Sequence, residues 1–458
     1  MKSLISWLIV AAIGFALMAF SHFNYQYQPG PDTWKYAFMY IGKADPNSQI
    51  EGLVYVKRPI RLLPMAQRAH NFTQVAKSFG SDIEKSYRVA YQEKVILYSD
   101  ITADFNDQML ELGRFPLPGA DEVIAGYRTA NKDTVTINGR AFKIAGQLKK
   151  NVRLFVDSYL ICDDAVAREL FNPDDEAVQN AYIFRLPKEQ LTNPQTLQLL
   201  KNAFPRSQFA TYTPLIQLQP KQFYLYIGGM TLLWLGGCLV LFRVYRLLAD
   251  KVNNKSLRLP LAEIGKYRRL FLTLHLVYFG AGILFMLAAY NMPELQACLS
   301  MGVKSQVVDG SGPLGVVGKA YMSKSIPLAA LATFAINFFL GSLAYITIPS
   351  VIIPGVGILA AVLRASIWGL LLAPNFDTLT GPMLPHSFTL LLEGEGYILA
   401  TFFGLLVLVY LFRKAEGPSV ARRYGKALLM NVRGNLLVAI VLAVAAIYEA
   451  IEVILMML

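Results

Sequence analysis

Long apolar runs limit what this chain can fold into more than any other feature of its sequence. They are about 20 residues long, the length that an α-helix needs to cross the hydrocarbon layer of a bilayer. Of the 458 residues, 54% are hydrophobic and only 16% are charged, a composition too apolar for an ordinary soluble protein. We therefore expect a polytopic α-helical membrane protein.

The runs predict about seven membrane spans. Tyr224 and Tyr226 mark the start of the second run, as aromatic residues do at a membrane interface. The first run could be a cleaved signal peptide, since Ala19-Phe20-Ser21 is a weak small-x-small site, but we favour an uncleaved anchor. The predicted spans are residues 4–20, 224–242, 270–290, 326–348, 352–372, 385–412 and 436–458.

Basic residues between the runs predict the orientation in the membrane. Lysine and arginine gather in residues 243–269 and again after residue 412, and cytoplasmic loops carry such an excess. The pattern predicts a cytoplasmic N-terminus and an outer C-terminus. We attribute the net charge of +12 to this pattern and not to nucleic-acid binding.

The two basic loops are also candidate docking surfaces for a cytoplasmic partner. Orientation and contact with lipid headgroups would account for their charge without a partner, so both interpretations stay open. The candidate docking residues are Arg243, Arg246, Lys266, Arg268, Arg269, Arg422 and Arg423.

Residues 22–222 carry most of the acidic residues and predict an extracytoplasmic α+β domain between the first two spans. We expect short strands at 54–56, 88–91 and 181–186, and helices at 164–170 and 194–202. Asn138-Gly139 between two β-rich runs predicts a hairpin. The residues show no catalytic constellation and no metal-binding pattern, so we expect a binding or structural domain and not an enzyme.

Three motifs in this domain follow one another in a specific order. They are Leu112-Gly113-Arg114-Phe115, then GADEVI at 119–124, then DTVTINGRAFKIAG at 133–146. Together with the first span, they resemble the extracytoplasmic core domain of MacB/FtsX-type permeases, although Lys132 stands where that family has glycine. The resemblance covers about residues 1–222 and implies a permease-like subunit that works with a separate cytoplasmic ATPase.

No nucleotide-binding motif accompanies this resemblance. Residues 310–320 superficially look like a phosphate loop, but Ala320 replaces the serine or threonine that would bind magnesium, and no strand is evident before them. If ATP drives this protein, another subunit hydrolyses it. We expect no cofactor.

Ionisable residues inside the last three spans form the candidate site. Such groups are costly at membrane depth and usually face a bundle interior or a cavity. Counting about 1.5 Å per residue along each span puts them roughly 9–15 Å below its outer end. They are Arg364, His386, Glu393, Glu395, Glu449 and Glu452.

Two interpretations of this set stay open, because one arginine cannot pair with four glutamates. In one, Arg364 neutralises one or two glutamates and ties three helices together. In the other, the excess carboxylates and His386 form a proton, cation or substrate site that opens to the outside. The spacing selects no metal. His275, on the third span, is predicted to be a hydrogen-bonded packing residue.

The last four spans also resemble a family. Asn337 with Gly341, then Leu384-Pro385-His386 with a following glutamate, then Ile447-Tyr448-Glu449-Ala450 are similar to motifs of the SpoIIM-like membrane proteins. Ser387 replaces a glycine of that family, and Glu393 follows the histidine by seven residues instead of about four. The resemblance covers about residues 325–458 and implies that Asn337, His386, Glu393 and Glu449 are the matching positions.

These observations predict five regions in a protein of the bacterial cytoplasmic membrane. Our leading hypothesis is a permease-like or mechanotransmitting subunit of an ATP-driven complex. The alternatives are a scaffold for envelope or peptidoglycan-remodelling proteins, and an ion- or proton-coupled transporter. The regions are an anchor (1–21), the α+β domain (22–222), two spans with a basic cytoplasmic loop (223–292), an outer loop (293–325) and a four-span domain (326–458).

Overall fold

The structure, a computed structural model of the whole chain, divides into two compact units. A helical unit comprises Met1–Tyr27, Ile216–Gln296 and Val303–Leu458, and an α+β unit comprises Gln28–Leu215 and Ala297–Gly302. The residues described are 2–26, 37–43, 53–98, 101–129, 132–162, 169–186, 190, 193–205, 208–212, 215–310, 312–412 and 419–457.

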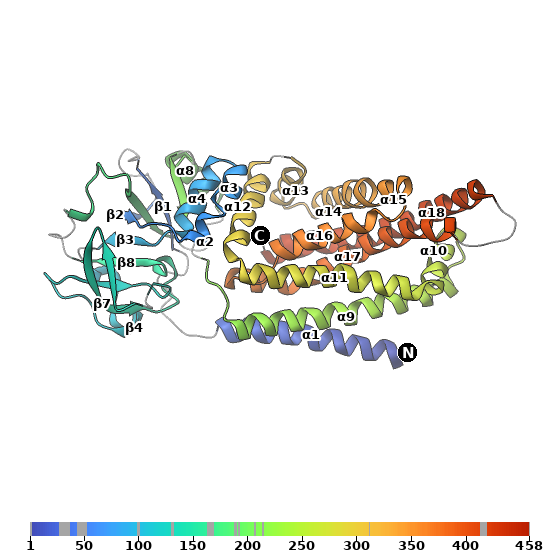
Figure 1. Cartoon of the computed structure of the whole chain (residues 1–458), viewed down its shortest axis with the longest axis horizontal. Coiled ribbons are helices and arrows are strands. Elements are labelled where there is room, and N and C mark those ends of the chain that lie inside the picture. Colours follow the sequence, from blue (N-terminus) through green and yellow to red (C-terminus); the bar gives the residue numbers. More distant parts are fainter. Residues whose placement is uncertain are drawn as a thin grey trace. The chain divides into compact units, whose positions relative to one another are not determined.

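The helical unit is built from long apolar helices (Figure 1). Most residues in α12 belong to this unit, although Ala297–Gly302 group with the α+β unit. The helices are α1 (Lys2–Gln26), α9 (Pro220–Lys251), α10 (Lys255–Lys266), α11 (Arg268–Asn291), α12 (Pro293–Asp309), α13 (Gly312–Met322), α14 (Ile326–Ala335), the π-helix η4 (Ile336–Thr347), α15 (Ile348–Ile352), α16 (Gly357–Leu371), α17 (Asp377–Phe412), α18 (Val420–Glu452) and the π-helix η5 (Val453–Met457).

Six helical segments among the described residues are long and apolar enough to cross a membrane. The expected fifth span, 352–372, contains the 15-residue apolar helix α16, which is about 22 Å long and shorter than a hydrocarbon layer of about 30 Å. Gly355, with a φ of 99°, lies in the turn that delays the start of this helix. The spans found are Leu4–Asn24, Pro220–Lys251, Arg268–Asn291, Ile326–Ile352, Asp377–Phe412 and Val420–Met456.

Several expected loops are helical, which corrects the sequence analysis. Helix α9 continues to Lys251, so Arg243 and Arg246 lie on it, and α10 fills much of the expected basic loop. The expected outer loop at 293–325 contains α12 and α13, and α17 begins at Asp377 instead of near residue 385. Hydropathy marks only the apolar part of a helix, and these helices continue into polar sequence.

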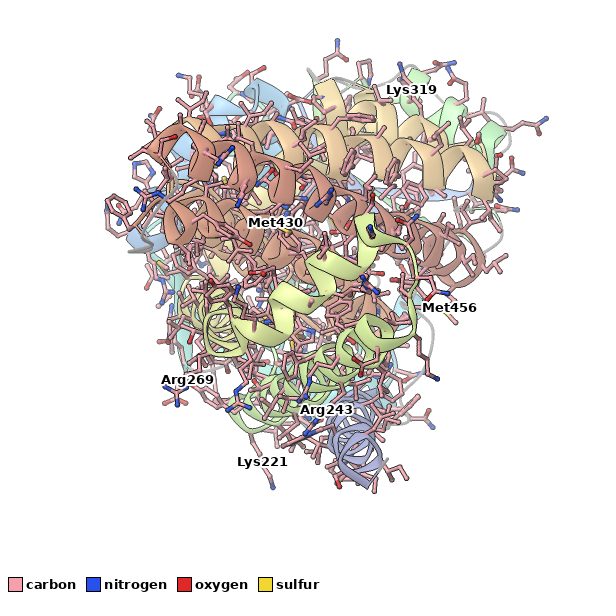
Figure 2. All side chains as sticks on the ribbon, turned by 90° about the vertical axis from the view of Figure 1, so that its right-hand side faces the viewer. Lys221, Arg243, Arg269, Lys319, Met430 and Met456 are labelled. Carbon is pink, nitrogen blue, oxygen red and sulfur yellow. The ribbon has the colours of Figure 1, made fainter. Side chains whose placement is uncertain are left out.

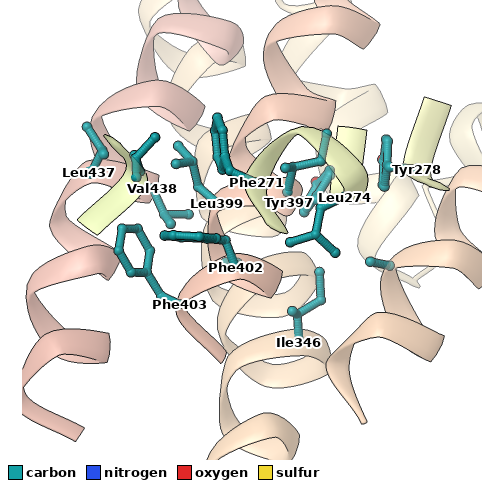
Figure 3. Packing of buried hydrophobic residues seen from close by; sticks show 14 of the residues in the cluster. Phe271, Leu274, Tyr278, Ile346, Tyr397, Leu399, Phe402, Phe403, Leu437 and Val438 are labelled. Atoms are coloured by element: carbon teal, nitrogen blue, oxygen red, sulfur yellow. The ribbon is translucent and has the colours of Figure 1, made fainter. Parts of the chain in front are cut away.

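The core of the helical unit is rich in aromatic residues. Figure 3 shows Phe271 of α11 beside Phe402 of α17, and Phe403 near Val438 of α18. These residues are almost fully buried, so they join α11, α17 and α18 into one packed group. Close packing of large buried side chains is a main source of stability for a helical bundle in a membrane.

Small residues let two of the helices approach backbone to backbone. Helices α1 and α9 lie side by side (Figure 1). A Cβ atom added to Gly229 of α9 would come within 2.6 Å of the Gly14 carbonyl oxygen of α1. Close packing of this kind is a common way for helices to associate in a membrane.

The α+β unit contains one mixed sheet of ten strands within the described residues. The strand order is β10-β1-β9-β2-β3-β8-β5-β7-β4, with β6 paired to β7. The pairs β3–β8 and β5–β7 are parallel and the others are antiparallel. The strands are β1 (Ala37–Gly42), β2 (Tyr55–Leu62), β3 (Lys94–Leu97), β4 (Leu110–Gly113), β5 (Glu122–Ala125), β6 (Thr134–Ile137), β7 (Arg140–Leu148), β8 (Ser158–Ile161), β9 (Val178–Arg185) and β10 (Phe209–Tyr212).

Short helices accompany the sheet. A buried cluster that includes Ile41, Ile60, Ile96 and Leu160 lies on one face of it. The helices are α2 (Gln67–His70), α3 (Thr73–Ser78), α4 (Ser81–Tyr91), α5 (Ile101–Asp104), α8 (Pro194–Ala203), and the 3₁₀ turns η2 (Asp107–Met109) and η3 (Arg153–Phe155).

Most of the local predictions in this unit are confirmed. The predicted hairpin is β6 and β7, and Asn138 and Gly139 both adopt positive φ, as the tight turn requires. The strand at 181–186 is β9, and the helix at 194–202 is α8. The strand expected at 88–91 is wrong, because these residues end the amphipathic helix α4. Most of the helix expected at 164–170 lies outside the described residues.

Ion pairs connect the three motifs that carry the first resemblance. Arg114 donates two hydrogen bonds of 2.7 Å to the Glu122 carboxylate, which also accepts the Leu117 N–H. The Arg114 guanidinium and this N–H lower the pKa of Glu122 to about 2. Arg140 of the hairpin binds the neighbouring Asp121, with its shorter hydrogen bond at 2.6 Å. The three motifs are therefore in contact with one another in the folded unit.

Candidate functional site

A network of polar side chains lies inside the helical unit and is centred on Arg364 of α16. The Arg364 guanidinium donates to Asn337 Oδ1 at 3.1 Å and to the Tyr397 hydroxyl at 2.5 Å. It also lies over the Tyr397 ring, 4.1 Å from its centroid. Asn337 in turn donates its amide N–H to Glu393 Oε1. The network thus joins η4, α16 and α17.

The π-helix η4 shapes the network. Asn337 is its second residue, and Gly341 lies four residues further along. A Cβ atom on Gly341 would lie 3.1 Å from the Tyr397 hydroxyl and 3.2 Å from Arg364 Nη1. The absent side chain therefore leaves room for the guanidinium, and π-helical turns are often found at such sites. This contact gives a structural reason for the spacing of Asn337 and Gly341.

Glu449 of α18 completes this network. Its carboxyl group is within hydrogen-bonding reach of Glu393 and near the Tyr321 hydroxyl of α13. Tyr321 itself shares a hydrogen bond of 3.0 Å with Thr333. No donor among the described residues reaches the buried Glu449 Oε2. Two carboxyl groups therefore face each other inside the bundle.

His386 and Glu452 form a separate pair. His386 Nδ1 lies 3.0 Å from Glu452 Oε1, and the Thr389 hydroxyl donates to Glu452 Oε2 at 2.5 Å. Glu452 is 2% exposed, and each of its oxygens has a partner on α17. This pair ties the end of α18 to α17.

Glu395 belongs to a different place, which corrects the prediction that all four glutamates lie together. It is fully buried, and its Oε2 lies 2.7 Å from His275 Nε2 of α11. His275 Nδ1 bonds the Phe271 carbonyl oxygen, so this nitrogen carries a proton and donates it. The Tyr245 hydroxyl of α9 is also beside Glu395. His275 is hydrogen-bonded in the core, as predicted.

The structure meets only indirectly the interpretation in which Arg364 neutralises glutamates. Among the described residues, no ion pair joins Arg364 to a glutamate, and Asn337 stands between the guanidinium and Glu393. The depth needs correction too. Because α17 begins at Asp377, Glu393 lies about 24 Å along that helix, deeper than 9–15 Å from its end.

Sequence analysis missed several polar partners. Tyr397 follows Glu393 by four residues and Thr389 follows His386 by three, so helical spacing could have identified both. Tyr321 could not have been found in this way, since it lies in a segment expected to be an outer loop. Gly394 and Gly396 pack against Tyr278 of α11 and Leu442 of α18, so these glycines let α17 approach both helices closely.

A small cavity adjoins the network. It has a volume of about 30 Å³, enough for one water molecule. Its polar lining comes from Glu393, Tyr278 and Tyr397, and Trp234 and Trp368 add aromatic walls. The described residues contain no group of three or more potential metal-ligating side chains.

The predicted docking residues Arg243 and Arg269 lie at the end of the helical unit where α9 ends and α10 begins (Figure 2). Arg246 is on α9, Lys266 is on α10, Arg268 is on α11, and Arg422 and Arg423 are on α18. Asn254 caps α10 by accepting the Ser256 N–H, which explains why the helix begins there. Leu261 and Ile264 are buried, and α10 packs against α9 and α18. The exposed basic residues of this surface include Arg246, Lys251, Lys255, Arg258, Lys266, Arg268, Arg269 and Arg422. Arg243 and Arg423 are half-buried.

The α+β unit has a buried polar cluster of its own. Lys94 is completely buried, and its ammonium lies 3.3 Å from Asp157 and 4.0 Å from the centre of the Tyr212 ring. Arg128 binds the same carboxylate at 2.9 Å, and the Tyr212 hydroxyl donates to it. Burial lowers the pKa of Lys94 to about 8, although Asp157 opposes this shift. Asp157 holds two cations in place.

Comparison with known protein families, curated proteins and solved structures finds no match for this chain. The two resemblances drawn from short motifs therefore remain predictions. The fold and the polar networks rest on the structure itself.

Proposed function

We propose that this chain is a permease-like or mechanotransmitting subunit of a bacterial ATP-driven membrane complex, with the ATPase on a separate subunit. The observation that best supports the proposal is the basic surface around α10. A capped amphipathic helix holds its apolar side on the bundle and turns its cations outward. Such a helix transmits force from a docked partner to α9 and α18, against which it packs.

The proposal includes an orientation in the cytoplasmic membrane. The α10 surface is cytoplasmic and the α+β unit is extracytoplasmic. Helix α16, with the turns that flank it, returns the chain across the bilayer, which gives seven crossings with the N-terminus inside and the C-terminus outside. The connectivity supports this, because Glu452 near the end of α18 contacts His386 and Thr389 in the first half of α17.

Affinity purification from native membranes in mild detergent tests the proposal. We expect an ATPase to copurify in a fixed ratio with the tagged chain. The variant Arg243→Glu/Arg246→Glu should lose it, since charge reversal at an interface adds repulsion. Lys221→Glu is the matched control, because it changes an exposed cation at the other end of α9 and should retain the partner.

Two other results of this experiment would count against the proposal. Copurification of cell-wall enzymes without an ATPase would contradict the proposal and favour the scaffold. Equal loss of the ATPase from the α9 variant and the Lys221→Glu control would show that docking does not depend on this surface.

A further inference from the structure

The central polar network has more negative than positive charge when all its groups are ionised. Its described members include one guanidinium, Arg364, and two carboxyl groups, Glu393 and Glu449. The Arg364 guanidinium donates its hydrogen bonds to Asn337 and Tyr397 and to neither glutamate. Asn337 supplies the donor to one oxygen of Glu393. A second unit of positive charge is therefore missing.

The contact between the carboxyl groups shows where that charge belongs. Glu393 and Glu449 are within hydrogen-bonding reach of each other. Two ionised carboxylates repel strongly at this range in a medium of low dielectric constant, and they cannot hydrogen-bond without a proton. Glu449 Oε2 receives no donor from any described residue. One proton between the two groups would remove both difficulties.

We propose that Glu393 and Glu449 form an intramembrane proton-binding site that holds one shared proton. One carboxyl group donates its O–H to the other carboxylate, and the pair carries a single negative charge that Arg364 balances. When the site releases its proton, the proton passes to water in the cavity lined by Glu393, and the pair is left with two charges. The ligand of the site is a proton, and no metal is needed.

The groups around the pair support this assignment. Tyr278 of α11, Tyr321 of α13 and Tyr397 of α17 face it with hydroxyl groups, and Asn337 faces it from η4. Arg364, the cation of the network, interacts electrostatically with both glutamates. The other ionisable neighbours are Glu452 and His386, which satisfy each other as a separate pair. The unmatched proton therefore belongs to Glu393 and Glu449.

This inference does not depend on an ATPase partner, because it concerns an equilibrium within the helical unit. The buried charges then do more than tie three helices together, and they do not form an open substrate site. At the contact between α17 and α18, the bundle gains or loses one charge when the site binds or releases a proton.

Infrared difference spectroscopy of the purified full-length chain in lipid nanodiscs tests the inference. At neutral pH we expect a protonated-carboxyl C=O band from the pair. Glu393→Gln and Glu449→Gln should each remove it, since the remaining glutamate can then ionise and accept from the new amide. Glu263→Gln, on α10, is the control and should leave the band unchanged.

The folding of the variants provides a second readout. Glutamine has the shape of a neutral glutamic acid and supplies an N–H donor, so Glu449→Gln should elute as a folded protein and retain the wild-type melting temperature within a few degrees. A band that persists in both glutamine variants would overturn the inference. Unfolding of both variants would also overturn it, since a site that holds a shared proton tolerates this replacement.

Discussion

At the scale of single residues, Lys94 shows how a charge survives inside the α+β unit. It is completely buried, yet its ammonium has Asp157, the Gln92 carbonyl oxygen and the Tyr212 ring as neighbours. Breaking such a set by removing one member leaves an uncompensated buried charge, which typically costs about 3–5 kcal/mol. The cluster therefore contributes to holding β3, β8 and β10 in one arrangement.

Because Lys94 loses its proton near pH 8 when folded, its effect on stability depends on pH. The unfolded lysine keeps its proton to about pH 10.4. Between these values the unfolded chain binds more protons, so this residue makes folding more favourable as pH rises. We expect pulse proteolysis of the full-length chain to show that the α+β unit gains stability relative to Lys94→Met from about pH 8 to pH 10.4. Parallel pH profiles of the two proteins would contradict this.

Part of the polar site could be predicted from the sequence. The rest could not, because depth in the membrane does not give the direction in which a side chain points. Membrane depth identified Glu393 and Glu449 among six ionisable residues, and the SpoIIM-like motifs added Asn337. Glu395 is only two residues from Glu393, and two residues turn a helix by about 200°. It therefore faces α11, where His275 binds it. Depth alone cannot show which side of a helix faces which neighbour.

At the scale of helices and strands, the contact between α1 and α9 depends on glycine. Gly229→Leu places a side chain where the α1 backbone already lies, so α1 must move. Overpacking of this kind typically costs about 1–3 kcal/mol, and backbone displacement can raise the cost. We expect a lower melting temperature in detergent.

Gly228→Leu is the matched control for this change. Gly228 is exposed and an added Cβ atom meets nothing within 4 Å, so the melting temperature should stay close to that of the wild type. Equal destabilisation by the two variants would mean that contact with α1 does not determine the result.

Helix boundaries were harder to predict than helix existence. Apolar runs identified α1, α9, α11, α14 with η4, α17 and α18, because burial in lipid demands them. They did not identify the polar continuation of α9 or the first eight residues of α17, since Pro382 and Pro385 read as loop residues and yet lie within the helix. In the α+β unit, Asn138-Gly139 predicted the hairpin correctly because the turn itself requires positive φ at both residues.

At the scale of the whole molecule, the proposed orientation can be measured. We expect Val54→Cys and Asn253→Cys, each made in a chain whose native cysteines are replaced by alanine, to react from opposite sides of the membrane. Both positions are exposed. A membrane-impermeant maleimide should label the first in intact spheroplasts and the second only in inverted vesicles. Labelling of both from one side would contradict the proposed topology.

The short helix α16 has a consequence for the lipid around the protein. Leu359, Leu363 and Ile367 form an exposed apolar stripe along it, yet the helix is about 8 Å shorter than a typical hydrocarbon layer. A bilayer accommodates a short apolar surface by thinning beside it, at a small cost for each ångström. Short acyl chains should therefore collect along α16, so that membrane thickness acts on the same helix that carries Arg364.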